Sequence, residues 1–247
     1  MTIRSNDELE GIVRVGKVVR TALDTMKKAV KPGTTTQALD DLCADVFERH
    51  GARSGPQLVY SFPGAACISI NDEAVHGIPR PTKTIRDGDL VKLDVTAELN
   101  GYFADAAITV GVGTVSSHRR RLARCTRSAL YHTLKGTRAN QPINGIGRSI
   151  QTAVERQGFN VMPDLGGHGV GRSVHEEPFV PNYYDPWDNR RLHPGLVIAI
   201  EPVISGGSGE SVTDDDGWTI KTADGSPSAH VEHTVVITHR GPMIVTA

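Results

Sequence analysis

Two aspartates, Asp94 and Asp105, stand in adjacent runs of residues that are typical of β-strands. Between them lie Asn100 and Gly101, a dipeptide typical of a two-residue hairpin turn because both turn positions require positive φ. Such a turn places Thr96 opposite Asp105, and alternate strand residues share a face. We therefore expect the aspartates to be diagonal neighbours, roughly 7–8 Å apart at the backbone, with converging carboxylates. Their neighbours are apolar, so pairing or metal binding is expected; the alternative is two solvated strand aspartates.

Two glutamates and two histidines with similar surroundings follow later in the chain. Glu201 follows an apolar run at residues 196–200, and Glu232 lies within another at residues 231–237. Glutamate is a poor strand residue and is rarely buried without a partner, so both positions need an explanation. His168 lies in the segment GGHGVG and His175 in VHEEP. Two aspartates, two glutamates and one histidine would form an oxygen-rich site for two divalent ions with an activated water between them.

Three other catalytic motifs are incomplete or missing. The segment HEEPF at residues 175–179 begins like the zinc-peptidase helix motif, but it lacks the second histidine, and Pro178 would break a helix. The glycines of residues 166–171 suit a phosphate-binding loop, yet no Gly-Lys-Ser/Thr follows and no clear helix begins there. No Gly-x-Ser-x-Gly occurs, so a serine hydrolase is unsupported.

The composition indicates an ordinary globular protein. The 247 residues are 38% apolar and 5% aromatic, enough for one large domain or two modest ones. The 27 Lys+Arg and 28 Asp+Glu give a net charge of -1, which excludes whole-chain attraction to DNA or to a membrane surface. No segment is typical of a signal peptide or a membrane span, and the three cysteines are widely spaced. We therefore expect a cytoplasmic protein with reduced thiols and no cysteine metal site.

The expected elements form an α+β pattern. Apolar spacing and capping residues predict helices at residues 6–30, 35–50, 116–135 and 142–157. Strand-like runs occupy residues 57–70, 90–99, 102–110, 196–200 and 231–237. Residues 34–51 and 141–158 share a pattern that ends in Glu-Arg-x-Gly both times. This indicates two duplicated halves, although chance similarity between two capped helices explains it equally well.

Several motifs, taken in their order along the chain, resemble those of type I methionine aminopeptidases. They are CISINDEAVHGIP at residues 67–79, LDVT at 93–96, GHGVGR with VHEEP at 167–178, IEPV at 200–203 and VEHT at 231–234. The similarity extends from the first helix to the last strand. The resemblance implies the duplicated pita-bread α+β fold, with a central antiparallel sheet flanked by helices. It also implies a dinuclear metal site formed by Asp94, Asp105, His168, Glu201 and Glu232.

The same resemblance implies an activity and the residues that carry it. The reaction would be removal of the initiator methionine from new chains whose second residue is small. Glu201 would transfer the proton of the water, His76 would stabilise developing charge or hold the scissile amide, and His175 would contact the substrate carbonyl. An apolar slot for the methionine side chain would be lined by Tyr60, Phe62, Cys67 and Trp218.

Four positions depart from the family pattern. Ala104 and Ala106 flank the second aspartate where the family usually has glycine and threonine, so a hydroxyl beside that carboxylate is expected to be missing. Gly64 stands where the family usually has lysine, and Val174 replaces a bulkier residue. We therefore expect an altered methionine slot with a weaker preference for Met over Leu.

The metal and the assembly are less determined. Mixed carboxylate and imidazole ligands tolerate Co, Mn, Fe, Zn and Ni, so the sequence leaves the identity of the two ions open. We expect a monomer with a single catalytic domain, residues 1–247, whose halves span roughly 1–115 and 116–247. The expected partners are the N-termini of nascent polypeptides. The arginines at residues 119–127 would contact the ribosome transiently or, in the simpler interpretation, form a solvated helix face.

Two rival functions stay open. One is a proline-specific peptidase of the same fold, although such enzymes usually carry an additional amino-terminal domain. The other is a metal-free protein of this fold that only binds peptides or RNA. Such proteins lose metal ligands, whereas all five candidates are present in this chain.

Overall fold

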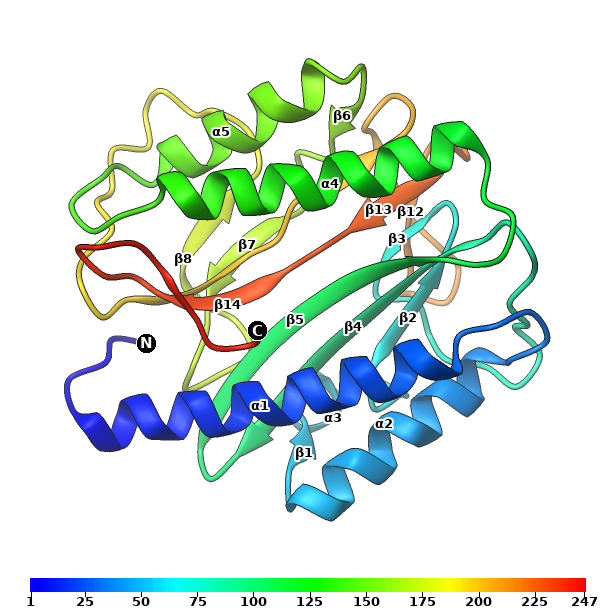
Figure 1. The fold of residues 1–247 in the computed structure, drawn as a ribbon, viewed down its shortest axis with the longest axis horizontal. Coiled ribbons are helices and arrows are strands. Elements are labelled where there is room, and N and C mark those ends of the chain that lie inside the picture. The colour runs from blue at the N-terminus through cyan, green and yellow to red at the C-terminus, as the bar shows by residue number, and fades with distance from the viewer.

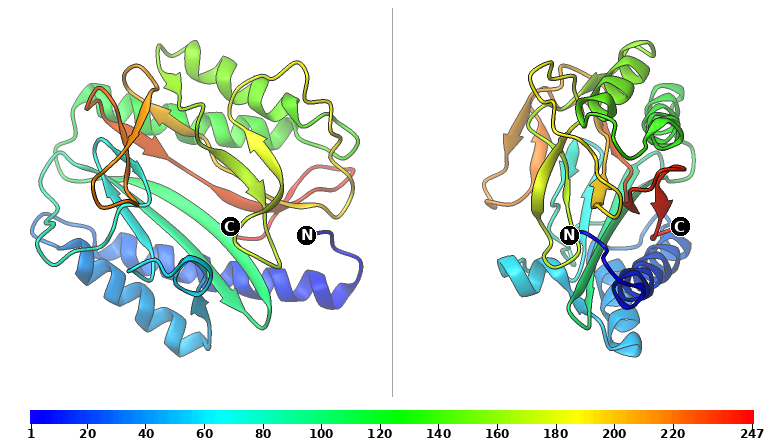
Figure 2. Two further views of the ribbon diagram at one scale, coloured as in Figure 1. Left: turned by 180° about the vertical axis from the view of Figure 1, so that it is seen from behind. Right: turned by 90° about the vertical axis from the view of Figure 1, so that its left-hand side faces the viewer.

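The computed structural model describes every residue from 1 to 247 (Figures 1 and 2). Its helices are α1 (Asn6–Ala29), α2 (Thr36–His50), α3 (Gly55–Tyr60), α4 (Ser117–Gly136) and α5 (Asn144–Glu155). The strands before α4 are β1 (Arg53–Ser54), β2 (Cys67–Ile70), β3 (Glu73–Val75), β4 (Leu90–Leu99) and β5 (Tyr102–Gly111). The strands after α5 are β6 (Asn160–Val161), β7 (Gly166–Gly169), β8 (Glu176–Pro181), β9 (Val197–Ile200), β10 (Val203–Ser205), β11 (Ser211–Thr213), β12 (Ile220–Thr222), β13 (Ser228–His230), β14 (His233–Val236) and β15 (Met243–Ile244).

All strand pairs are antiparallel, and they form four sheets. In the first sheet β4 pairs with β1, β2 and β5, and in the second β10 lies between β13 and β6. The third sheet joins β3 to β12 and β11, and the fourth has the order β15-β14-β9-β7-β8. In Figure 1, α1 and α2 lie at one end of the molecule and α4 and α5 at the other, with β4, β5 and β14 running between them. The predicted α+β fold class is confirmed.

Side-chain caps explain where the long helices begin. The hydroxyl oxygens of Ser5, Thr35 and Ser116 accept hydrogen bonds from backbone amides in the first turns of α1, α2 and α4. These bonds satisfy amides that have no partner within the helix. Gly51, with φ 65°, follows α2 in the left-handed conformation that favours glycine. The predicted helices are confirmed, with small differences at their ends.

Part of the strand prediction for residues 57–70 is wrong. Residues 55–60 form α3 instead, and only Cys67–Ile70 is a strand. The hydroxyl oxygen of Ser54 accepts a hydrogen bond from the amide of Gln57, and Pro56 occupies the first turn, where its missing N–H costs nothing. This local capping outweighs the β-propensity of the residues that follow.

The predicted hairpin register is confirmed. Asn100 and Gly101 have φ values of 53° and 81° and form the turn between β4 and β5. Thr96 pairs with Asp105, and Asp94 pairs with Ala107. Asp94 and Thr96 therefore lie on one face of β4, and Asp105 lies on the same face of β5.

The two faces of β4 have different environments. Val91, Leu93 and Val95 are fully buried in an apolar core that also contains residues of α1 and α2. The opposite face carries Asp94 and Thr96. A second apolar core lies beneath α4 and α5 and includes residues of β9 and β14. The division into duplicated halves within one domain stays a prediction.

The close contact between α1 and the C-terminal segment predicts a specific cost of substitution. A Cβ at Gly16 would lie 2.1 Å from the carbonyl oxygen of Val245, whereas a Cβ at Gly145 in α5 would meet nothing within 4 Å. Gly16→Ala is expected to lower the free energy of unfolding by about 1–3 kcal/mol through overpacking. Gly145→Ala, the matched control, is expected to raise it by about 0.5–1 kcal/mol. Urea unfolding measures both, and equal effects of the same sign would contradict this packing.

Candidate active site

A cavity of about 700 Å³ is lined by residues from both ends of the chain. Every residue that the sequence analysis assigned to metal binding, catalysis or substrate binding lines it: Tyr60, Phe62, Cys67, His76, Asp94, Asp105, His168, His175, Glu201, Trp218 and Glu232. The structure therefore brings all the candidates together, although they come from segments up to 172 residues apart (Tyr60 to Glu232).

Asp105 is held by hydroxyl groups from two sheets, one at its carboxylate and one at its backbone. The hydroxyl of Thr96 donates to its Oδ2 at 2.7 Å. The backbone of Asp105 exchanges two hydrogen bonds of 2.8 Å with the side chain of Thr234. Ala106 supplies no hydroxyl, as expected, but Thr96, which stands opposite Asp105 on β4, supplies one to this carboxylate.

His168, Glu201 and Glu232 come from neighbouring strands of the five-stranded sheet. His168 lies in β7, Glu201 directly follows β9, and Glu232 directly precedes β14. Nε2 of His168 is 3.4 Å from Oε1 of Glu201. Donor atoms within 4.8 Å of one another come from Asp105, His168 and Glu232.

One further histidine, His230, belongs to this cluster and was missed by the sequence analysis. Its Nε2 is 3.3 Å from Glu201 and 3.7 Å from Glu232, and neither ring nitrogen has a hydrogen-bond partner. The three residues form a second group whose donor atoms lie within 4.8 Å. The available signal was its spacing, because residues two apart in an extended segment point to the same side.

The protein alone does not supply enough hydrogen bonds or positive charge to offset the burial of the carboxylates in this cluster. Burial, followed by repulsion from neighbouring carboxylates, raises the pKa of Asp94 and Glu232 well above their usual values. Burial raises the pKa of Glu201 to about 8. Oδ1 of Asp105 and Oε1 of Glu232 are buried without a hydrogen-bond partner. Such oxygens, next to the His230 imidazole without partners, are donors suited to divalent ions, so the residues present fit a metal centre.

Two other histidines lie in the same cavity. Burial lowers the pKa of both His76 and His175 to about 4, so both are neutral at pH 7. His76 has φ 57°, an unusual backbone conformation for a histidine, and directly follows β3. The ring of His175 lies 4.2 Å from that of His168, and its Nδ1 is 2.6 Å from the hydroxyl of Tyr60.

Aromatic and small apolar groups occupy the side of the cavity next to the carboxylates. Phe62 and Trp218 pack edge to face with ring centroids 5.2 Å apart, and Cys67 pairs with Asp94 across β2 and β4. Val174 is buried in the same wall, where its Cγ2 would lie 3.1 Å from a Cβ at Gly55. Any Cβ at Gly64 would lie 2.7 Å from Pro79, so glycine is the residue that this contact permits.

The structure explains the motifs that were set aside. A Cβ at Gly167 would lie 2.2 Å from the carbonyl oxygen of Ala199, so this glycine allows β7 to approach β9. Strand packing therefore explains the glycine without a phosphate-binding loop. The segment HEEPF lies in and before β8, not in a helix.

The three cysteines are free and buried. No helix combines the length and the apolar character needed to cross a membrane.

A mixed α+β fold with a carboxylate–imidazole cluster in a deep cavity defines a metal-dependent hydrolase. The family model "Metallopeptidase family M24" matches residues 10–239, and the chain belongs to this family. Methionine aminopeptidase 2 of Bacillus subtilis is 42% identical over 247 residues, which are 100% of this chain and 99% of the relative. The crystal structure of a methionine aminopeptidase from Thermotoga maritima has a TM-score of 0.97 at 38% identity, covering 100% of this chain and 99% of that one.

Proline-specific enzymes share the fold at greater distance. A Xaa-Pro dipeptidase from Bacillus anthracis has a TM-score of 0.79 at 18% identity, and the likeness covers 99% of this chain but 62% of that one. This likeness shows the pita-bread fold alone. The family and the donor cluster together support the use of divalent metal ions by this chain.

Protons and metal ions are expected to compete for the carboxylates. Glu201, whose pKa is raised to about 8, keeps its proton at pH 6 in the metal-free state, and a metal ion must displace it. The increase in unfolding temperature on adding Mn²⁺ to chelator-treated protein should therefore be larger at pH 8 than at pH 6. Calorimetry measures this increase in unfolding temperature. In the variant Glu201→Gln, the increase should depend less on pH. An increase that is independent of pH would contradict the raised pKa.

Proposed function

We propose that this chain is a methionyl aminopeptidase, a dinuclear metal-dependent exopeptidase that removes the N-terminal methionine of polypeptides whose second residue is small. The observation that carries the proposal is the cavity in which the carboxylate–imidazole cluster adjoins a slot with Phe62 and Trp218 packed edge to face. The high identity to methionine aminopeptidases along the whole chain supports the same substrate class.

The five residues named in the sequence analysis are the proposed metal ligands: Asp94, Asp105, His168, Glu201 and Glu232. Divalent ions bound there would polarise the scissile carbonyl and lower the pKa of a water molecule. The carboxylates of Asp105 and Glu232 would hold these ions, which agrees with their buried oxygens that lack partners. His230 lies behind Glu201 and Glu232 and would hold these carboxylates in place. Carboxylate and imidazole donors suit Mn, Fe, Co, Ni and Zn.

Three residues are proposed to act directly on the substrate. Glu201 would take the proton of the attacking water and pass it to the leaving amine, since its carboxylate lines the cavity among the other proposed ligands. Neutral His76 would donate a hydrogen bond to the scissile amide or to the charge that develops there. Neutral His175, backed by the hydroxyl of Tyr60, would contact the substrate carbonyl.

The slot formed by Tyr60, Phe62, Cys67 and Trp218 would take the methionine side chain. A thioether packs favourably against aromatic rings and sulfur. Beyond the scissile bond, the next substrate side chain would lie close to the carboxylate cluster. A small second residue is therefore favoured.

The proposed setting is the cytoplasm, with nascent chain N-termini as partners and the chain acting as a monomer. Several arginines of α4 have partners within the molecule: Arg119 donates to the carbonyl oxygen of Gly88, and Arg121 to that of Gln157. Arg127 lies over the ring of Tyr131. These contacts favour the interpretation of α4 as a structural, solvated helix face over a dedicated ribosome contact.

A peptide panel tests the substrate class. Met-Ala-Ser and Met-Gly-Ser peptides should be cleaved after methionine, whereas Met-Leu-Ser and Met-Lys-Ser should resist cleavage. EDTA should abolish cleavage and a divalent ion should restore it, as measured by mass spectrometry. Leu-Ala-Ser tests the slot, whose preference for Met over Leu is expected to be about 1–3 kcal/mol or less. Preferential cleavage of X-Pro peptides would favour a proline-specific enzyme, and no cleavage with any metal would favour a binding module.

The proposed role of His76 predicts a separation between catalysis and metal binding. His76→Ala should lower kcat about 100-fold, because it removes a hydrogen bond made in the transition state, and should leave the metal content unchanged. His50→Ala, on the exposed end of α2, is the control and should keep the original kcat. Elemental analysis alongside kinetics decides the matter. Loss of the metals in His76→Ala would make His76 a ligand or a structural residue and contradict the proposed role.

A further inference from the structure

Lys92 is the largest of the fully buried side chains, with 1% of its surface exposed. It lies on the polar face of β4, two residues before Asp94. A buried amine is costly unless its N–H groups have partners. None of the roles proposed above uses this lysine.

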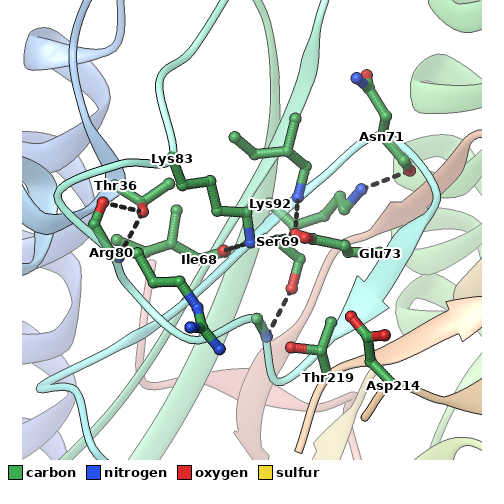
Figure 3. A network of polar contacts seen from close by, with 12 residues as sticks. Thr36, Ile68, Ser69, Asn71, Glu73, Arg80, Lys83, Lys92, Asp214 and Thr219 are labelled. Carbon is green, nitrogen blue, oxygen red and sulfur yellow. Dashed lines mark hydrogen bonds and ion pairs between the residues drawn. The ribbon is translucent and has the colours of Figure 1, made fainter. Parts of the chain in front are cut away.

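Main-chain carbonyl groups from two distant segments surround the Lys92 amine. Nζ donates to the carbonyl oxygen of Asn71 at 2.8 Å, as Figure 3 shows, and to that of Ser228 at 3.5 Å. The hydroxyl of Ser228 also makes contacts of 3.0 Å and 3.1 Å with the carbonyl oxygens of Asn71 and Glu73. The amine therefore lies among carbonyl oxygens that belong to the turn before β3 and to β13.

Both segments lead directly into the cavity. The turn at Asn71 continues through β3 to His76, and β13 begins at Ser228 and ends two residues before Glu232. His76 has positive φ, so contacts on both sides of it must maintain its conformation. On the far side, the amide of Gly77 donates to the hydroxyl oxygen of Ser69 at 3.0 Å.

We propose that Lys92 is a positioning residue of the active site: its amine holds the carbonyl groups of Asn71 and Ser228 together and thereby keeps His76 in place relative to Glu232. This inference rests on the proposed peptidase function. Lys92 itself does not touch the substrate, because it does not line the cavity.

The charges around Lys92 are consistent with this role. Burial lowers the pKa of its amine to about 7, and the carboxylates of Glu73 and Asp72 oppose that shift. Lys83 occupies the outer side of the network, where its Nζ pairs with Oε2 of Glu73 at 2.5 Å (Figure 3). The two carbonyl contacts need only two N–H groups, so the amine can make them whether or not it carries the extra proton.

Truncation with chemical rescue tests the proposal. Lys92→Ala should lower kcat by about tenfold or more, because a small misplacement of a catalytic group is costly, with metal content unchanged. Ammonium chloride should restore kcat in a saturable manner, since the ion fits the emptied space and donates to the same carbonyl groups. Tetramethylammonium chloride at equal ionic strength, which has no N–H group, should not. Lys92→Met should lose as much kcat but gain nothing from ammonium, because its side chain fills the space.

Two further variants complete the design. Lys92→Gln keeps N–H donors on a side chain that is one bond shorter, so it should retain more of kcat than Lys92→Met does. Lys221→Ala is the control: this lysine lies at the surface, pairs with Asp214, and should show no dependence on ammonium. If Lys92→Gln is as impaired as Lys92→Met, the carbonyl contacts do not carry the effect and the proposal is wrong.

A measurement without substrate separates this inference from the proposed function. The imidazole NMR signals of His76 in metal-free protein should shift in Lys92→Ala and return with ammonium, whatever peptide the wild-type protein cleaves. If ammonium raises the unfolding temperature of Lys92→Ala but changes neither kcat nor these signals, Lys92 is only a structural residue. An unchanged kcat in Lys92→Ala would also overturn the proposal.

Discussion

Four carboxylates share one end of a cavity, and the free-energy cost of placing them together away from water is the constraint on which the rest of this structure depends. Burial raises the pKa of Asp94, Glu201 and Glu232, which means that each ionised form is disfavoured there without a cation. Hydroxyl and imidazole groups compensate only part of that cost, since buried oxygens of Asp105 and Glu232 lack partners. Divalent ions would supply the remaining compensation and, with it, the chemistry.

The fold provides the rigidity that such a cluster requires. Asp94 and Asp105 stand on a hairpin of two ten-residue strands whose other face is anchored in the apolar core under α1 and α2. His168, Glu201 and Glu232 come from a separate sheet, within which Gly167 of β7 lies close to the carbonyl oxygen of Ala199 in β9. Because the proposed ligands come from two sheets, the cluster forms only when these sheets are folded against each other.

The groups around the carboxylate cluster are neutral histidines and apolar side chains. Burial lowers the pKa of His76 and His175 to about 4, so in the proposed mechanism they would act as hydrogen-bond donors without adding charge. The apolar slot beside them would separate a substrate side chain from water. The Lys92 amine connects the carbonyl groups of Asn71 and Ser228, which belong to the segments that lead to His76 and Glu232. In this proposal, the polar group that positions the catalytic residues, Lys92, lies outside the cavity, whereas the apolar residues of the slot line it.

The amino-acid sequence by itself determined the features that arise from neighbouring residues. Asn100 and Gly101 require a tight turn, so the pairing of Thr96 with Asp105 followed from counting, and the acidic and histidine motifs identified the candidate site. Local reasoning failed at α3, where the cap at Ser54 outweighed strand propensity. Only the tertiary structure placed His230 beside Glu201 and the Lys92 amine beside the carbonyl oxygen of Ser228, because these partners lie in segments that are distant along the chain.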